Sequence, residues 1–235
     1  MKINTDLVKG KKYSSAVKPN TLKHSQEYRV LATLRYLYSS KFDTMITGEA
    51  PDLQYSTNNT GIEVTVAVKE DDMKVSRAFS ELNQGKPKDI EKRKNIIESS
   101  GYSFVPLKDE KVAISTSGTA DGEKYFFQQS ILRKAKKLQQ YRTNFKKIGL
   151  AILLPEIPTS YAENHLSEWI SEMLDESANL FDFVYVISHR FCLYYDTQAK
   201  ITEKRLLTQD ESLLLATIGR MTAEGELTMT DTEWQ

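Results

Sequence analysis

The chain is poor in the residues that build disulfide-bonded and zinc-stabilised proteins. Among its 235 residues only Cys192 is a cysteine, which excludes an intramolecular disulfide and a cysteine-rich zinc site. The three histidines, His24, His165 and His189, are far apart and lack the spacing of a metal-binding motif. The sequence has neither a glycine-rich phosphate loop nor the strand-to-helix serine motif of many hydrolases. These absences argue against several common kinds of catalytic site.

Long apolar runs are also missing. The longest, residues 148–155, is far too short to cross a bilayer. No apolar run follows the charge in residues 1–6, so the start does not read as a secretory signal. We therefore expect a cytoplasmic protein that makes no contact with membranes.

The chain has no formal net charge, because 32 Lys and Arg residues balance 32 Asp and Glu residues. The distribution of charge is uneven, since residues 124–155 contain no acid at all. The basic residues of that block are Lys124, Arg133, Lys134, Lys136, Lys137, Arg142, Lys146 and Lys147. A block of one sign can follow a phosphate backbone. A solvated helix face explains such a charge run equally simply when the run is taken by itself.

The composition fits one α/β domain with a full core, because 40% of the residues are hydrophobic and 27% are charged. Apolar spacing and turn residues predict helices over 24–38, 71–82, 89–99, 123–142, 160–177 and 208–221. They predict strands near 45–54, 62–68, 102–107, 111–115, 148–154, 181–187 and 191–195, with loops at 56–61 and 117–122. This order favours a mixed central sheet flanked by helices.

Two predicted strands carry acidic residues on one face. Leu53, Tyr55, Ile62, Val64 and Val66 are apolar, whereas the alternate positions are Asp52, Gln54, Glu63 and Thr65. Because side chains alternate along a strand, an antiparallel register with Gln54 opposite Glu63 and Asp52 opposite Thr65 collects all polar residues on one face. A shift by one residue would mix the two sets. The pattern therefore brings Asp52 and Glu63 to roughly 7 Å as diagonal neighbours.

Two adjacent carboxylates repel each other unless a cation lies between them. Hard oxygen ligands suit Mg²⁺ or Mn²⁺, and the backbone carbonyl of Val64 could supply a further ligand. The alternative is a solvent-facing hairpin that happens to carry polar residues.

Charged residues inside two apolar helix stripes bear on this choice. Glu27 falls in the middle of the stripe of the first predicted helix, and Lys134 falls in the middle of the stripe of the 123–142 helix, with Lys137 at its edge. A charge on a core-facing stripe is costly to bury unless it is paired. One buried polar site containing these residues explains the pattern, and so does a purely structural Glu27–Lys134 pair.

Taken together, these residues resemble the PD-(D/E)XK, or restriction-endonuclease-like, nuclease superfamily. The matching segments are Pro51-Asp52 and, after the turn, Glu63-Val64-Thr65. The resemblance implies a helix–hairpin–helix–strand core formed by 24–68 and 123–155, with an insertion at about 70–120. The family usually carries a lysine where this chain has Thr65, and some branches supply that lysine from the following helix, which here gives Lys134 or Lys137 with Tyr141.

The resemblance implies a Mg²⁺- or Mn²⁺-dependent endonuclease that hydrolyses nucleic acid, expected to be DNA, in defence or in a mobile element. Asp52 and Glu63 would hold the metal, Glu27 would assist them, and Lys134 or Lys137 would position water. Groups expected to contact the substrate are Gln54, Thr65, Arg133, Lys136, Tyr141, Arg142, Lys146 and Lys147. For Tyr141, packing alone is the alternative role, and a lone tyrosine favours it.

Two other interpretations remain open at this point. The chain is either an inactive nuclease-like fold that binds nucleic acid or assembles complexes, or a subunit that works as a homodimer or with a partner protein. The expected organisation is an N-terminal arm at 1–22, a nuclease-like α/β domain at 23–200, and a C-terminal helix with an acidic tail at 201–235.

Overall fold

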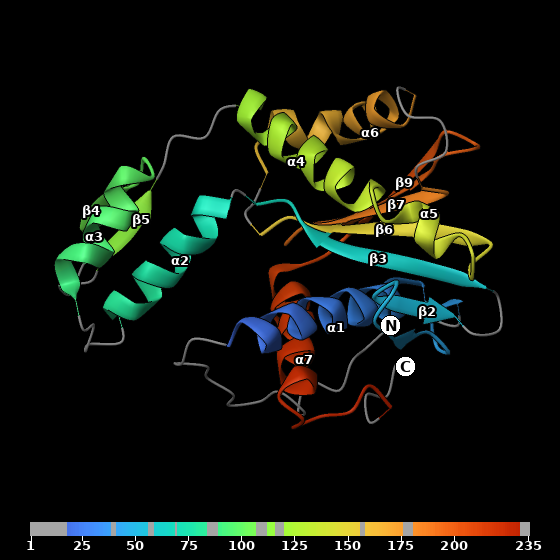
Figure 1. Ribbon diagram of the computed structural model, residues 1–235, viewed down its shortest axis with the longest axis horizontal. Helices are drawn as coiled ribbons and strands as arrows, with labels where there is room; N and C mark the ends of the chain where they lie inside the picture. The colour runs from blue at the N-terminus through green and yellow to red at the C-terminus, as the bar shows by residue number, and fades with distance from the viewer. Residues whose placement is uncertain are drawn as a thin grey trace.

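A computed structural model describes residues 18–38, 41–55, 59–68, 70–83, 89–106, 112–115, 120–155, 158–175 and 181–230. Most of the expected N-terminal arm and the end of the acidic tail lie outside these residues. A seven-stranded sheet with helices on both faces forms the body of the fold (Figure 1). The predicted mixed α/β architecture is therefore present.

The sheet has the strand order β1-β2-β3-β6-β7-β8-β9. Its strands are β1 (Ile46–Thr47), β2 (Leu53–Tyr55), β3 (Thr60–Val66), β6 (Lys147–Leu153), β7 (Phe183–Ile187), β8 (Phe191–Asp196) and β9 (Ile201–Leu206). The three central strands β3, β6 and β7 run parallel, and the strands on either side pair antiparallel. Strand β6 is buried on both faces, which explains its continuous apolar sequence.

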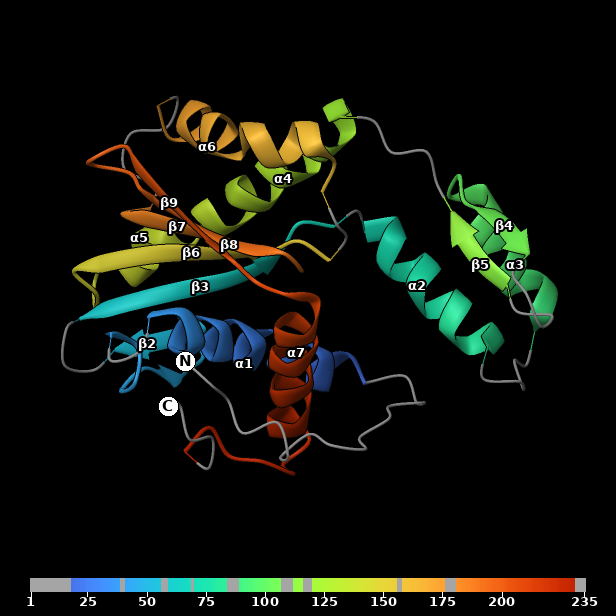
Figure 2. The same cartoon turned by 180° about the vertical axis from the view of Figure 1, so that it is seen from behind.

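Helices cover the two faces of this sheet in separate layers (Figures 1 and 2). One layer holds α1 (Pro19–Tyr38) and α7 (Gln209–Ala223), and the other holds α4 (Ala120–Ala135), α5 (Leu138–Tyr141) and α6 (Ser160–Asp175). Each layer closes its own apolar core against the sheet. Helices α1 and α7 approach closely at Gly219, where a Cβ atom would lie 2.7 Å from backbone atoms of Ser25 and Arg29.

Residues between β3 and α4 form a separate small unit beyond the end of the sheet (Figure 2). It contains α2 (Glu70–Asn83), α3 (Ile90–Ser99) and the antiparallel hairpin β4 (Ser103–Pro106) and β5 (Val112–Ser115). Its own core is built around Val75, Ala78, Ile97 and Tyr102. This unit occupies the region where the sequence places an insertion.

Three expectations about element boundaries are wrong. The helix expected over 123–142 begins earlier, at Ala120, and breaks at Lys136–Lys137 into α4 and α5. Helix α1 begins at Pro19, inside the expected arm. Residues 201–206, expected to open the C-terminal helix and tail, instead form β9, which pairs with β8 as the outer strand of the sheet. Strand β9 escaped prediction because its residues are almost all exposed and show no alternation.

Candidate functional site

The turn into β2 places Asp52 beside Glu63 through a close contact between Pro51 and Gly61. A Cβ atom on Gly61 would lie 2.2 Å from Cγ of Pro51, so only glycine leaves room for the proline ring. The pairing of Gln54 with Gly61 and of Leu53 with Ile62 sets the register. One further step along this register brings Asp52 to the level of Glu63.

The expected register is therefore wrong by two residues, since Gln54 lies opposite Gly61 and not opposite Glu63. A shift of two leaves every side chain on its predicted face, because the side-chain period of a strand is two. The hydrophobic pattern could not distinguish the two registers, whereas the Pro51–Gly61 contact does. In the observed register Asp52 and Glu63 lie directly opposite each other, and therefore closer together than as diagonal neighbours.

The acids are buried, which excludes the solvent-facing hairpin. Asp52 is 3% exposed, Glu63 is 1% exposed and Thr65 is 4% exposed. The Oδ2 atom of Asp52 accepts a hydrogen bond of 2.8 Å from the backbone N–H of Val64, whose own side chain packs in the core on the α1 side. The backbone thus fixes the orientation of the Asp52 carboxylate. The expected use of the Val64 carbonyl as a ligand stays a prediction.

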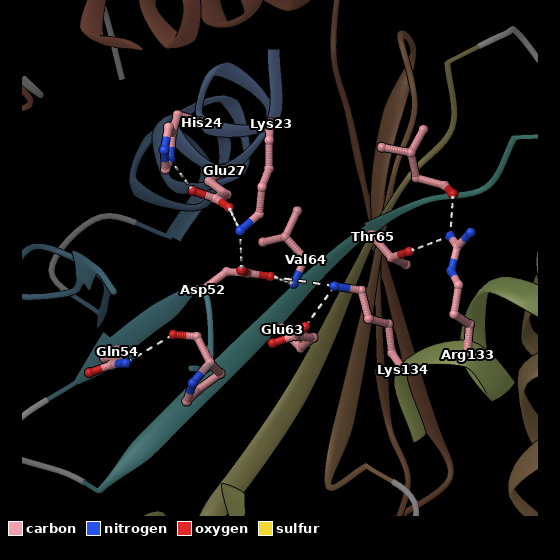
Figure 3. Close-up of polar contacts among 12 residues, drawn as sticks. Lys23, His24, Glu27, Asp52, Gln54, Glu63, Val64, Thr65, Arg133 and Lys134 are labelled. Atoms are coloured by element: carbon pink, nitrogen blue, oxygen red, sulfur yellow. Dashed lines mark hydrogen bonds and ion pairs between the residues drawn. The ribbon is translucent and has the colours of Figure 1, made fainter. Parts of the chain in front are cut away.

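Lys134 of α4 lies between the two acids (Figure 3). Its Nζ atom is 2.6 Å from Oε1 of Glu63 and 3.7 Å from Oδ2 of Asp52. The lysine side chain is only 16% exposed, so its contact with Glu63 is a largely desolvated ion pair. Helix α4, far from β2 and β3 in the sequence, therefore delivers a cation to the acidic pair.

A second lysine, which sequence reasoning missed, lies on the other side of Asp52. The Nζ atom of Lys23 is 3.7 Å from Oδ1 of Asp52 and 3.3 Å from Oε1 of Glu27. His24 Nδ1 lies 2.9 Å from the other oxygen of Glu27. Burial lowers the pKa of Lys23, but the charges of Glu27 and Asp52 outweigh that effect, so its pKa is raised. The available sequence signal was the spacing of four between Lys23 and Glu27 on a helix.

Two carboxylate oxygens of this cluster remain without a hydrogen-bond partner among the described residues. They are Oε2 of Glu63 and Oε1 of Glu27, both fully buried. Oε1 of Glu27 has the ion pair with Lys23 at 3.3 Å. Buried, unmatched carboxylate oxygens carry a high desolvation cost. Together with Asp52, the free oxygen of Glu63 fits a hard divalent cation.

Two more predicted residues lie at the site. Arg133 Nη2 donates to Oγ1 of Thr65 at 3.1 Å and to the carbonyl of Val66 at 3.3 Å, so its guanidinium group lies beside Thr65. Tyr141, the last residue of α5, is buried. Burial, followed by the charge of Glu63, raises the pKa of Tyr141. The hydroxyl of Tyr141 therefore faces the acidic pair.

Other predicted residues are not brought to the acids. Lys136 and Lys137 are exposed where the helix breaks, and Lys134, not Lys137, contacts the carboxylates. Arg142 pairs with Asp182 at 3.2 Å. Gln54 lies on the correct face, but its amide donates to the Pro51 carbonyl at 3.0 Å and points away from the cluster (Figure 3). A catalytic role of Lys137 stays a prediction, and the contact with the acids comes from Lys134.

Among the residues that the structure describes, no group of three or more His, Cys, Asp or Glu side chains is arranged to hold a metal ion. The candidate ligand set is therefore the pair Asp52 and Glu63, with Glu27 separated from them by Lys23. Within the same residues, no helix has the length and apolar character needed to cross a membrane. Comparisons of the chain with protein-family models, with curated proteins and with solved structures find no match.

Proposed function

We propose that the chain is a divalent-metal-dependent nuclease with a restriction-endonuclease-like core, acting on DNA. The observation that supports this most strongly is the meeting of Asp52, Glu63 and Lys134 from three separate elements at one buried point. The unmatched oxygen of Glu63 adds to it. A purely structural ion pair would not require a second carboxylate and a spare oxygen at the same place.

In this proposal Asp52 and Glu63 hold Mg²⁺ or Mn²⁺. A bound ion of this kind polarises the phosphate and lowers the pKa of its water, which supplies the nucleophile at neutral pH. The Val64 N–H fixes the orientation of the Asp52 carboxylate that would hold the ion. Glu27 acts from outside this pair, through Lys23.

Lys134 has two tasks at such a site. Its ammonium group donates to the attacking water and to the phosphate oxygens on which negative charge grows as the P–O bond breaks. Because the ammonium is largely removed from solvent, its effect on that charge is stronger than in water. Arg133, held beside Thr65, and Tyr141 would offer further donors to the phosphate group.

The remaining basic residues of the 124–155 block would contact the phosphates of neighbouring nucleotides. Lys136, Lys146 and Lys147 are exposed, and Arg142 would exchange Asp182 for a phosphate. Such contacts provide affinity that decreases with salt and reads no base sequence.

The proposal is tested by incubating the protein with supercoiled plasmid, single-stranded DNA and RNA in MgCl₂, MnCl₂ or EDTA. We expect metal-dependent cleavage of at least one substrate, abolished by Asp52→Asn and Glu63→Gln. Lys134→Met should lower the rate by about 100-fold or more, as expected for loss of a transition-state donor. Lys137→Met is the matched control, because it removes the same charge three residues away, and it should leave the rate nearly unchanged.

A second candidate function is an inactive nuclease-like fold that binds nucleic acid. The 2.6 Å pair between Lys134 and Glu63 favours it, because the lysine already compensates part of the acidic charge without a metal. Salt-sensitive binding to DNA with no cleavage under any metal condition would support this function. Cleavage that survives Asp52→Asn would contradict the catalytic proposal.

A further inference from the structure

Asp52 has two oxygens in two different environments. Oδ2 faces inward, toward the Val64 N–H and Lys134, whereas Oδ1 faces Lys23. Figure 3 shows Lys23 reaching down from α1 to Asp52, on the opposite side from Lys134. A cation is therefore held on each side of this one carboxylate.

The two lysines differ greatly in their exposure to solvent. The side chain of Lys134 is 16% exposed, whereas that of Lys23 is 57% exposed. The carboxylates of Asp52 and Glu27 beneath Lys23 are 4% and 3% exposed. Lys23 thus covers the buried carboxylates of Asp52 and Glu27 on the side that faces solvent. An ion that approaches Oδ1 of Asp52 from this side meets the Lys23 ammonium group.

The contacts of Lys23 are also the weaker ones. Its distances of 3.3 and 3.7 Å exceed the 2.6 Å between Lys134 and Glu63. The Glu27 oxygen nearest to it is buried and lacks a hydrogen-bond partner among the described residues. An exposed lysine also regains side-chain freedom when it leaves an ion pair. Lys23 therefore occupies a position that favours a cation, but its contacts with the carboxylates there are long.

We propose that Lys23 is a displaceable counter-ion that covers the outer side of the site and competes with the divalent cation for Asp52. In the metal-free protein its ammonium balances Glu27 and Asp52. When a divalent ion binds Asp52, the two positive charges repel each other, and the long exposed side chain moves outward. The nature of the ion rests on the proposed function, whereas the competition rests on the geometry of Lys23.

Two roles of Lys23, as a support for Asp52 and as a competitor for it, predict opposite changes in metal affinity when the lysine is removed. If Lys23 holds Asp52 in its binding orientation, removal of the lysine weakens metal binding. If Lys23 competes for Asp52, removal strengthens it. The Val64 N–H fixes Asp52 independently of Lys23, which is why we expect strengthening.

The test is calorimetric titration of the full chain with MnCl₂, after treatment with EDTA and its removal. Lys23→Met should bind Mn²⁺ about threefold to tenfold more tightly than the unsubstituted protein, as expected for removal of a half-exposed charge beside buried acids. Lys23→Arg keeps the charge and should stay within about twofold. Lys92→Met, an exposed lysine on α3 in the separate unit, is the control for net charge and should also stay within about twofold.

Unchanged or weaker Mn²⁺ binding by Lys23→Met, with circular dichroism showing a folded protein, overturns the competition. Equal tightening by Lys92→Met overturns it as well, because the effect would then come from net charge. If neither the unsubstituted protein nor Lys23→Met binds Mn²⁺, the metal site itself is refuted, and the proposed function fails with it. Binding that is present but insensitive to Lys23 leaves the proposed function standing.

Discussion

Replacement of Lys134 by methionine should make the stability of the fold depend on a divalent ion. The substitution keeps a similar volume on α4 but removes the ammonium 2.6 Å from Glu63. Glu63 and Asp52 are 1% and 3% exposed. Among the described residues, Lys23 would remain as the lysine within ion-pair distance of Asp52, and it does not pair with Glu63. A buried carboxylate that has lost its partner is strongly destabilising.

The size of this effect follows from the geometry. Breaking one partner of a buried ion pair costs about 3–5 kcal/mol. Lys134 retains some contact with solvent and its second contact is long, at 3.7 Å, so we expect the lower end, about 3 kcal/mol. For a chain of this length each kcal/mol changes the melting temperature by about 2–4 °C, which gives a loss of about 6–12 °C in EDTA.

A divalent ion should restore most of that loss. An ion present at about 100 times its Kd stabilises the folded state by about 2.7 kcal/mol. In Lys134→Met the ion meets two acids without the Lys134 ammonium beside them, so we expect a larger gain in melting temperature from MnCl₂ than in the unsubstituted protein. The assay is thermal unfolding followed by circular dichroism, in EDTA and in saturating MnCl₂.

The matched control is Lys137→Met, which should melt close to the unsubstituted protein in both buffers because Lys137 is exposed. If Lys134→Met melts at the same temperature as Lys137→Met in EDTA, Lys134 does not compensate a buried charge. If it melts lower but MnCl₂ does not raise its melting temperature, the acids do not form a cation site. Either result refutes the reasoning.

Three further predictions concern the supports of the site and the fold. Gly61→Ala should cost about 1–3 kcal/mol of stability and weaken Mn²⁺ binding, because the added methyl group displaces the Pro51 ring and with it Asp52. Urea unfolding measures the stability and calorimetry measures the Mn²⁺ affinity, and an unchanged affinity contradicts the argument. Arg35→Met should destabilise the fold by about 2–4 kcal/mol in urea unfolding, because the buried guanidinium donates to four backbone carbonyls that would lose their partner. Stability should decrease above pH 9, because burial raises the pKa of Cys192 from 9.0 to about 12 and also raises that of Tyr185. The unfolded thiol then loses its proton while the folded one keeps it, so the contribution is complete below pH 9 and is lost as the pH rises toward 12; a urea midpoint that is equal at neutral pH and about pH 10 would contradict this.

The sequence by itself determined which residues share a face or a stripe. Alternation along 52–55 and 62–66 placed Asp52 and Glu63 on one side of the hairpin, and the structure has them there. A charge in the middle of an apolar helix stripe identified Glu27 as buried and Lys134 as largely removed from solvent. Both inferences succeed because burial imposes a period on the sequence, of two in strands and 3.6 in helices.

Tertiary contacts decided the features of the fold that leave no periodic pattern in the sequence. The two-residue shift of register preserves the period and depends on the Pro51 ring fitting against Gly61. The break of the helix at Lys136–Lys137 contains neither glycine nor proline, and β9 is exposed along most of its length. Lys23 lies just before the helix expected over 24–38, and its contacts with Asp52 and Glu27 exist only in the folded chain. Local sequence reports how deeply a residue is buried, whereas its partner across the fold is set by segments far away in the chain.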